Sequence, residues 1–194
     1  MNILIAFTTT EGQTRKIARA MQRTVETAGH AVTLHDCAER TVRIKSADFD
    51  AVILAASVHH RRYQSALYDF VAAHLAALQQ KPVAFVSVSL SVTLASGEAE
   101  AQEYVSEFIS ETGLSVDAVH LAEGAIRYFE YSRSEASTID LVVFKGQKTM
   151  PERNANPEYT DWAALEAFVM RFVDQVTREM VADATRPGVP PCCC

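Results

Sequence analysis

Residues 1–29 hold an apolar run, a threonine-rich loop and an amphipathic helix, and this succession most constrains the fold. Residues 3–7 form a continuous apolar run, which is typical of a strand covered on both faces of a parallel sheet. Beyond the loop, apolar residues recur at helical spacing until Gly29, and these are Ile17, Met21, Val25 and Ala28. A buried parallel strand followed at once by a helix predicts an α/β fold.

The loop between this strand and helix has the composition of a phosphate site. It consists of Thr8, Thr9, Thr10, Glu11, Gly12, Gln13 and Thr14. A helix that begins there points its unpaired N–H groups and its positive dipole end at the loop. The threonine hydroxyls can donate to phosphate oxygens, and Gly12 lets the backbone approach closely. The loop has no lysine and fits neither the P-loop motif nor the GxGxxG motif. A phosphate here would be held by neutral donors alone, which favours a phosphate monoester such as that of FMN.

The same residues also fit a plain threonine-rich helix cap, because threonine is a common capping residue. The local pattern does not separate the two interpretations. The place of the loop in the chain favours the phosphate site, since the first βα turn of an open α/β sheet is where such folds bind phosphates.

The rest of the chain alternates predicted strands and helices. Further strands are predicted at 31–34, 51–56, 83–88 and 116–121, and helices over 67–78 with Ser65 as cap, over 104–109 up to Gly113, and from Thr160-Asp161 to Val176. Five strands in this alternation predict a doubly wound parallel sheet with helices on both faces. Right-handed crossovers favour the strand order 2-1-3-4-5, which places a ligand at the carboxyl ends of strands one and three.

One domain is predicted over residues 1–180, with an insertion at 125–159 before the last helix. The insertion shows no clear period, although residues 139–144 are apolar. It is interpreted either as a hairpin or interrupted fifth strand at the sheet edge, or as a lid or membrane-contacting element. The basic residues Arg127, Arg133, Lys145 and Lys148 favour the second interpretation. The acidic residues Glu130, Glu135 and Asp140 oppose it.

The composition excludes several classes of protein. The net charge of −6 argues against a nucleic-acid partner, because nucleic-acid-binding proteins need an excess of basic residues. No apolar run approaches the roughly 20 residues of a membrane-spanning helix, and no signal-peptide pattern opens the chain, so a cytoplasmic protein is expected. Cys37 is predicted to be a small, buried or half-buried apolar residue. Residues 181–194 are predicted to be a disordered tail ending in Cys192, Cys193 and Cys194, whose role is left open.

Two further loops leave the carboxyl edge of the predicted sheet and can flank a flavin ring. The first begins with Ser57, Val58, His59 and His60, and the second with Ser89, Leu90 and Ser91. No metal site is predicted, because adjacent histidines point in different directions and no third ligand lies at suitable spacing. His60 or Tyr63 is predicted to line either the ring pocket or a substrate mouth. Arg61 and Arg62 predict either a positive mouth for an anionic substrate or a solvated basic loop.

Longer pieces of the sequence resemble one known family. Besides the loop at 8–14, they are Ala56-Ser57-Val58 with His60 and Tyr63, Ser65-Ala66, residues 85–90, Gly124-Ala125-Ile126-Arg127-Tyr128 and Tyr159-Thr160-Asp161-Trp162. These pieces resemble the flavodoxin-like, quinone-dependent protoporphyrinogen IX dehydrogenases over essentially residues 1–176. Family members tend to carry a basic, apolar helix in the insertion, whereas residues 129–135 here are mixed in charge, and the cysteine tail is foreign to the family.

The resemblance implies a flavodoxin-like fold that binds FMN, with the phosphate at residues 9–14 and the ring between the loops at 57–60 and 89–91. It implies oxidation of protoporphyrinogen IX, a step of heme biosynthesis, with a membrane quinone as acceptor and peripheral membrane contact through residues 125–159. No catalytic side chain is predicted, because the flavin carries the chemistry. A flavodoxin-like electron carrier and an NAD(P)H:quinone reductase remain as alternatives, and the oligomeric state is left open.

Overall fold

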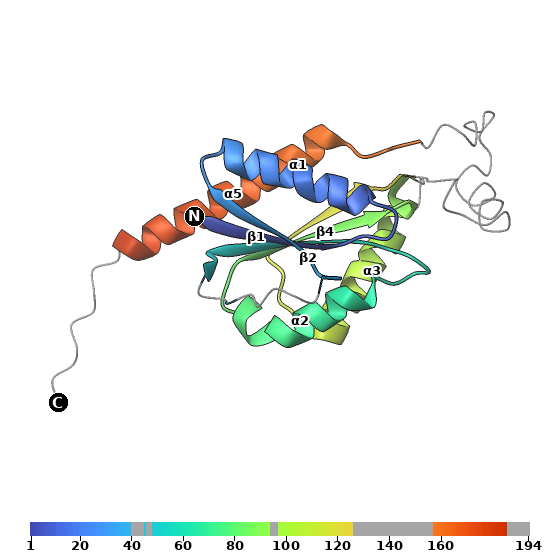
Figure 1. Cartoon of the computed structure of the whole chain (residues 1–194), viewed down its shortest axis with the longest axis horizontal. Helices are drawn as coiled ribbons and strands as arrows, with labels where there is room; N and C mark the ends of the chain where they lie inside the picture. The colour runs from blue at the N-terminus through green and yellow to red at the C-terminus, as the bar shows by residue number, and fades with distance from the viewer. Residues whose placement is uncertain (40–44, 46–47, 94–96, 126–156, 186–194) are drawn as a thin grey trace.

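A parallel β-sheet forms the centre of the molecule (Figure 1). The computed structural model of the chain describes residues 1–39, 45, 48–93, 97–125 and 157–185. In this described part the sheet has five strands in the order β2-β1-β3-β4-β5. They are β1 (Asn2–Thr8), β2 (Ala31–Asp36), β3 (Ala51–Ser57), β4 (Val83–Ser89) and β5 (Ala118–Glu123). The predicted strand order is confirmed.

The register brings the carboxyl ends of the strands to one edge of the sheet. Thr8 pairs with Ala56, and Ser57 pairs with Val88. Ser89 in turn pairs with Glu123. All four pairings are parallel, so each strand leaves the sheet at the same edge. The loops that follow β1, β3 and β4 therefore lie next to one another.

Helices cover both faces of the sheet (Figure 1). The helices α1 (Gln13–Thr27) and α5 (Trp162–Thr185) pack on one face, and α2 (Ser65–Leu78) and α3 (Gly97–Thr112) on the other. A short 3-10 turn, η2 (Ser91–Thr93), lies between β4 and α3. This is the doubly wound arrangement that the sequence predicts.

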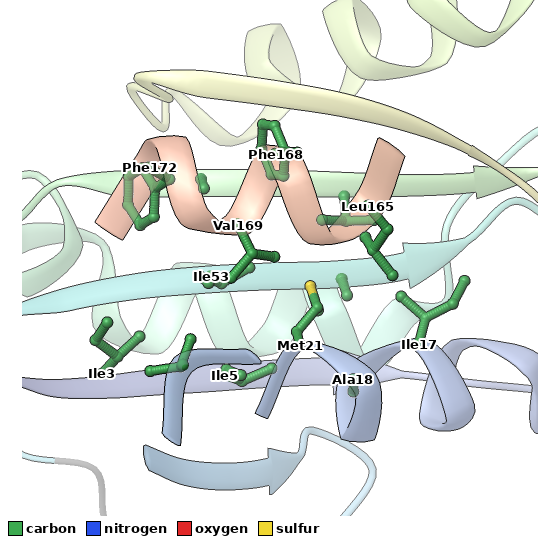
Figure 2. Close-up of a cluster of buried hydrophobic side chains, with 14 of the residues drawn as sticks. Ile3, Ile5, Ile17, Ala18, Met21, Ile53, Leu165, Phe168, Val169 and Phe172 are labelled. Carbon is green, nitrogen blue, oxygen red and sulfur yellow. The ribbon is translucent and has the colours of Figure 1, made fainter. Parts of the chain in front are cut away.

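Strand β1 contributes to the hydrophobic cores on both faces, which explains its continuous apolar run. Ile3 and Ile5 point toward α1 and α5, whereas Leu4 and Ala6 point toward α2 and α3. Figure 2 shows the first of these cores, where Met21 of α1 and Val169 of α5 lie among the strand side chains. Because side chains alternate along a strand, a strand with helices on both faces has no polar side.

Several boundaries differ from the sequence prediction. Strand β2 extends to Asp36 rather than ending at residue 34, and α3 begins at Gly97 rather than near residue 104. Ser65 is the first residue of α2 rather than its cap, and Gln64 at the N-cap makes no capping bond with its side chain. Strand β5 begins at Ala118, because the Asp117 carboxylate accepts the Val83 N–H at 2.7 Å before the ladder starts. Helix α5 runs to Thr185, past Val176, the last residue of the predicted helix. The predicted cap of α5 is confirmed, since Asp161 Oδ1 accepts the Ala164 N–H at 2.9 Å.

Other predictions fall on segments outside the described residues. These include the interior of the insertion (126–156) and the end of the tail (186–194). Cys37 is half-buried against the core beneath α2, as predicted, and burial raises the pKa of its thiol to about 12. None of the helices in the described ranges is both long and apolar enough to cross a lipid bilayer.

Candidate functional site

The loop between β1 and α1 closes on a glycine in the left-handed region. Gly12 has φ 85° and is the N-cap of α1, and its carbonyl accepts the Lys16 N–H at 3.1 Å. Its own N–H donates to Thr9 Oγ1 at 2.9 Å. Only glycine adopts this backbone conformation without steric cost. The first turn of α1 carries no acidic residue, and the carboxylate of Glu11, which precedes the N-cap, lies 3.9 Å from the His59 ring.

Thr14 carries an unsatisfied hydroxyl at this helix N-terminus. Among the buried side-chain nitrogen and oxygen atoms of the described residues, only Thr14 Oγ1 has no hydrogen-bond partner. A buried hydroxyl without a partner costs about 1–3 kcal/mol. Such a group at the second residue of a helix is suited to an anion held by the helix N-terminus. The loop therefore fits the phosphate of a flavin nucleotide.

Two of the predicted site residues direct their side chains to other parts of the protein. The buried Thr8 hydroxyl donates to Gln64 Oε1 at 2.6 Å. The buried Gln13 amide donates to Thr160 Oγ1 at 2.9 Å. In this structure both side chains stabilise the loop from within the protein rather than present a donor at its surface.

Gln64 joins the phosphate loop to the loop after β3, and the sequence analysis missed it. Its Nε2 donates to Thr10 Oγ1 at 2.9 Å and to Ser57 Oγ at 2.8 Å. Its Oε1 accepts the Thr8 hydroxyl on the other side. Thr8 and Thr10 lie 56 and 54 residues away in the sequence, so no local pattern identifies the contact between the two loops. The only available signal is the topology, which places the ends of β1 and β3 side by side.

We expect Gln64→Ala to lower the free energy of unfolding by about 1–2 kcal/mol, because three side-chain hydrogen bonds are lost, two of them to the segment after β1, and water replaces them only in part. Gln22→Ala is the matched control: Gln22 is also half-buried, but it bonds only Glu26 within α1. Urea unfolding of both variants measures the difference. Equal loss of stability in the two variants would contradict a bracing role for Gln64.

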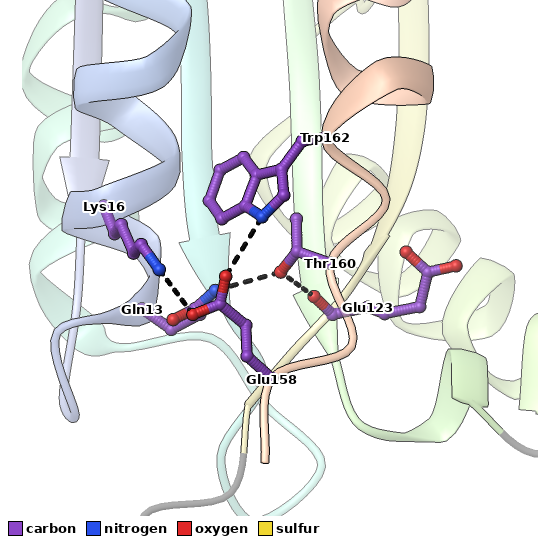
Figure 3. A network of polar contacts seen from close by, with 6 residues as sticks. All are labelled: Gln13, Lys16, Glu123, Glu158, Thr160 and Trp162. Carbon is purple, nitrogen blue, oxygen red and sulfur yellow. Dashed lines mark hydrogen bonds and ion pairs between the residues drawn. The ribbon is translucent and has the colours of Figure 1, made fainter. Parts of the chain in front are cut away.

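A buried chain of hydrogen bonds ties α1 to β5 (Figure 3). Thr160 Oγ1 accepts from the Gln13 amide and donates to the Glu123 carbonyl oxygen at 2.7 Å. Thr160 belongs to the Tyr159-Thr160-Asp161-Trp162 piece that carries part of the family resemblance. Its role in the fold is therefore to hold the first turn of α1 against the sheet.

An ion pair fixes the base of the insertion to the same turn. Lys16 Nζ lies 2.5 Å from Glu158 Oε2, and Trp162 Nε1 donates to Glu158 Oε1 at 3.0 Å. Lys16 also lies over the Trp162 ring (Figure 3). Ala125 and Glu158 form an antiparallel bridge, so the two ends of the insertion meet beside α1.

The basic residues of α1 near the loop are engaged by carboxylates. Arg15 Nη2 lies 2.7 Å from Asp36 Oδ2 at the end of β2, and Lys16 pairs with Glu158. Neither cation is directed to the loop. The donors that the loop offers are then hydroxyl and amide groups, which agrees with the sequence prediction of neutral donors.

The loop after β3 makes a tight turn in an unusual conformation. The His59 N–H donates to the Arg62 carbonyl oxygen at 2.8 Å, and the Arg62 N–H returns to His59 at 3.1 Å. Between them His60 and Arg61 have φ 48° and 63°, the type I′ values that usually require glycine or asparagine. The His59 ring lies 3.9 Å from Glu11 Oε1 of the phosphate loop. This turn thus reaches the phosphate loop through His59.

The predictions for the rest of this loop are only partly supported. His60 is exposed, but Tyr63 is buried and donates to Ser87 Oγ at 2.8 Å, so Tyr63 does not line a pocket. Burial also raises the pKa of the Tyr63 hydroxyl. Arg61 and Arg62 pair with Glu100 and Glu111 of α3 at 2.9 and 2.6 Å. The predicted positive mouth is therefore neutralised.

The loop after β4 completes the edge. Ser89 Oγ accepts the Ser91 N–H at 3.0 Å, and the Ser89 carbonyl accepts the Gly124 N–H at 3.2 Å. The Val58 N–H donates to the Val88 carbonyl at 2.8 Å, which ties the loop after β3 to the end of β4. The predicted site segments at 8–14, 57–60 and 89–91 thus come together at one edge of the sheet. In the described ranges, no three His, Cys, Asp or Glu residues gather so as to hold a metal ion.

Comparison with known proteins agrees with this geometry. The family model described as "Flavodoxin domain" matches residues 4–153, which include all three segments of the site. The chain belongs to the flavodoxin family. A flavodoxin domain implies a flavin cofactor, and the edge described above is where this chain offers phosphate donors.

Relatives and solved structures extend the comparison. The chain is 28% identical to "Protoporphyrinogen IX dehydrogenase [quinone]" of Escherichia coli strain K12 over 170 residues, 87% of this chain and 92% of the relative. The protein of the same name from Leishmania major is 27% identical over 176 residues, 87% of this chain and 73% of that relative. The resemblance predicted from the sequence is confirmed.

Oxidised flavodoxin 1 from Bacillus cereus superimposes with a TM-score of 0.56 at 16% identity, covering 90% of this chain and 98% of that one. A flavodoxin from the domain Archaea gives a TM-score of 0.54 at 16% identity, covering 91% and 99%. At this identity the two structures confirm the flavodoxin-like fold.

Proposed function

We propose that this chain binds FMN and oxidises protoporphyrinogen IX to protoporphyrin IX with a quinone as electron acceptor. The observation that carries the cofactor is the buried, unpartnered Thr14 hydroxyl beside Gly12 at the start of α1. The substrate and acceptor rest on the 28% identity to the dehydrogenase of Escherichia coli, which extends over 92% of that protein.

The phosphate of FMN would be held by residues 9–14. The hydroxyl oxygens of Thr9 and Thr10 each accept one hydrogen bond from the protein, from the Gly12 N–H and the Gln64 amide. Since a hydroxyl both accepts and donates, each threonine keeps its hydrogen to donate to a phosphate oxygen. Thr14 adds a third hydroxyl, and the N-terminus of α1 adds its dipole.

The loops at 57–60 and 89–91 would flank the flavin ring. The bound flavin supplies the hydride and electron transfer chemistry of such an enzyme. The protein's own contribution is to hold the ring, to orient the substrate and to exclude water between the two loops. We assign no acid or base among the side chains, because the flavin would carry the hydride transfer.

Anaerobic turnover of protoporphyrinogen IX with menadione or ubiquinone, followed by porphyrin fluorescence, tests the proposal. We expect the FMN-loaded protein to exceed the rate of the same concentration of free FMN. A rate equal to that background would contradict the proposal. Rapid bleaching of the flavin by NADH or NADPH alone would instead indicate an NAD(P)H:quinone reductase, and bound FMN without porphyrinogen turnover would indicate an electron carrier.

A membrane quinone as acceptor would also require contact with the inner face of the cell membrane, through residues 125–159. Cosedimentation of the full chain with anionic lipid vesicles measures that contact, and protein that stays in the supernatant would argue for a quinone acceptor in solution.

A further inference from the structure

A single carboxylate on α3 bonds to both of the loops assigned to the flavin ring. Glu100 Oε1 accepts from Arg61 Nη1 at 2.9 Å, in the turn after β3. Glu100 Oε2 accepts from the Ser91 hydroxyl at 2.7 Å, in the loop after β4. These two hydrogen bonds connect segments that otherwise leave separate strands.

Tyr104 fixes this carboxylate from within the protein. The Tyr104 hydroxyl donates to Glu100 Oε1 at 2.6 Å, and its ring is buried in the core beneath α3. Tyr104 lies one helical turn after Glu100, so the helix itself sets the position of the carboxylate. The hydrogen bonds from Tyr104 and Ser91, with a smaller contribution from Arg61, lower the pKa of Glu100, so the group is ionised near neutral pH.

The bond to Arg61 is made at a residue with an unfavourable backbone conformation. Arg61 has φ 63° and follows His60 at φ 48°, two consecutive left-handed residues without a glycine. The Arg61 guanidinium pairs with Glu100 and lies 5.5 Å from the centre of the Tyr104 ring. A turn of this kind persists only when surrounding contacts hold it. Besides the backbone hydrogen bonds between His59 and Arg62, two ion pairs to α3 hold this turn, and Glu100 makes the one to Arg61.

We propose that Glu100 is a positioning residue that sets the spacing of the loops after β3 and β4, and thereby the affinity of the protein for the flavin held between them. This inference rests on the proposed FMN site. In this inference a residue of α3, outside the phosphate loop, shapes the ring pocket.

The test is a set of full-length variants titrated with FMN by fluorescence quenching. We expect Glu100→Gln, which keeps the shape and removes the charge, to weaken FMN binding by about three- to tenfold, as for loss of a charged hydrogen bond. Glu103→Gln is the control, since Glu103 is an exposed carboxylate of the same helix outside this network. Thermal unfolding confirms that each variant is folded.

A double-mutant cycle separates positioning from general stability. Arg61→Gly removes the ion pair and permits the left-handed turn, so Glu100→Gln is expected to have a clearly smaller effect on FMN affinity in that background. The inference would be overturned if the two substitutions changed FMN affinity by independent factors, or if Glu100→Gln bound FMN as tightly as wild type. Either result would leave the FMN site intact. A wild-type chain that binds no FMN would instead overturn the proposed function itself.

Discussion

Replacing Gly12 by valine is expected to abolish FMN retention, lowering affinity by at least about a hundredfold. The cause is the backbone rather than crowding: Gly12 has φ 85°, and a Cβ at this position would meet no atom within 4 Å. An L-residue in the left-handed region costs roughly 1–2 kcal/mol, and a β-branched residue more. If the backbone at residue 12 relaxed to a negative φ, its N–H would move away from Thr9 Oγ1 and the first turn of α1 would be displaced.

Gly29 offers a matched control at the other end of the same helix. It also has φ 85°, and a Cβ added there would meet no atom within 4 Å. Its N–H donates to the Glu26 carbonyl oxygen at the end of α1. Gly29→Val should therefore lower the thermal midpoint about as much as Gly12→Val while the protein keeps its flavin. The measurement is the flavin absorbance of each purified variant and its FMN dissociation constant. Unchanged retention in Gly12→Val would place the cofactor elsewhere.

The fold was predictable because its signals are local. Each buried strand is a short apolar run and each helix has an apolar face, so the alternation of elements is visible in the sequence, and crossover handedness then leaves few strand orders. The errors occur where a side chain competes with the backbone pattern. Asp117 takes a strand N–H and delays β5, and Gln64 bonds to loops rather than capping α2.

The site was predictable only in outline. The phosphate loop has a recognisable composition, and the topology places it beside the loops after β3 and β4. The contacts that shape these loops were not predictable, because their partners are distant in the chain. Arg61 and Arg62 suggest a positive mouth when their charges are counted, but Glu100 and Glu111 on α3 neutralise them. The unsatisfied hydroxyl of Thr14 likewise depends on what surrounds it, which composition does not reveal.

Thr14→Val is expected to move two measurements in opposite directions. In the flavin-free protein, valine has nearly the shape of threonine and removes a buried hydroxyl that has no partner. The free energy of unfolding should therefore stay the same or rise by up to about 1 kcal/mol. In the complex the same change removes a donor to a charged phosphate, so FMN should bind about ten- to a hundredfold more weakly. A residue that matters only for packing would lower stability without this selective loss.

Because riboflavin lacks the phosphate, its affinity distinguishes contacts to the ring from contacts to the phosphate. Thr14→Val should leave riboflavin affinity unchanged, because the lost hydroxyl serves the phosphate alone, whereas Thr14→Ser should retain FMN binding close to wild type. Urea unfolding of the flavin-free proteins measures their stabilities, and titration with FMN and with riboflavin measures the two affinities of each protein. If valine destabilises the flavin-free protein, the hydroxyl has a partner within the fold. If valine weakens FMN and riboflavin equally, Thr14 acts on the ring or the whole loop, and the phosphate lies elsewhere.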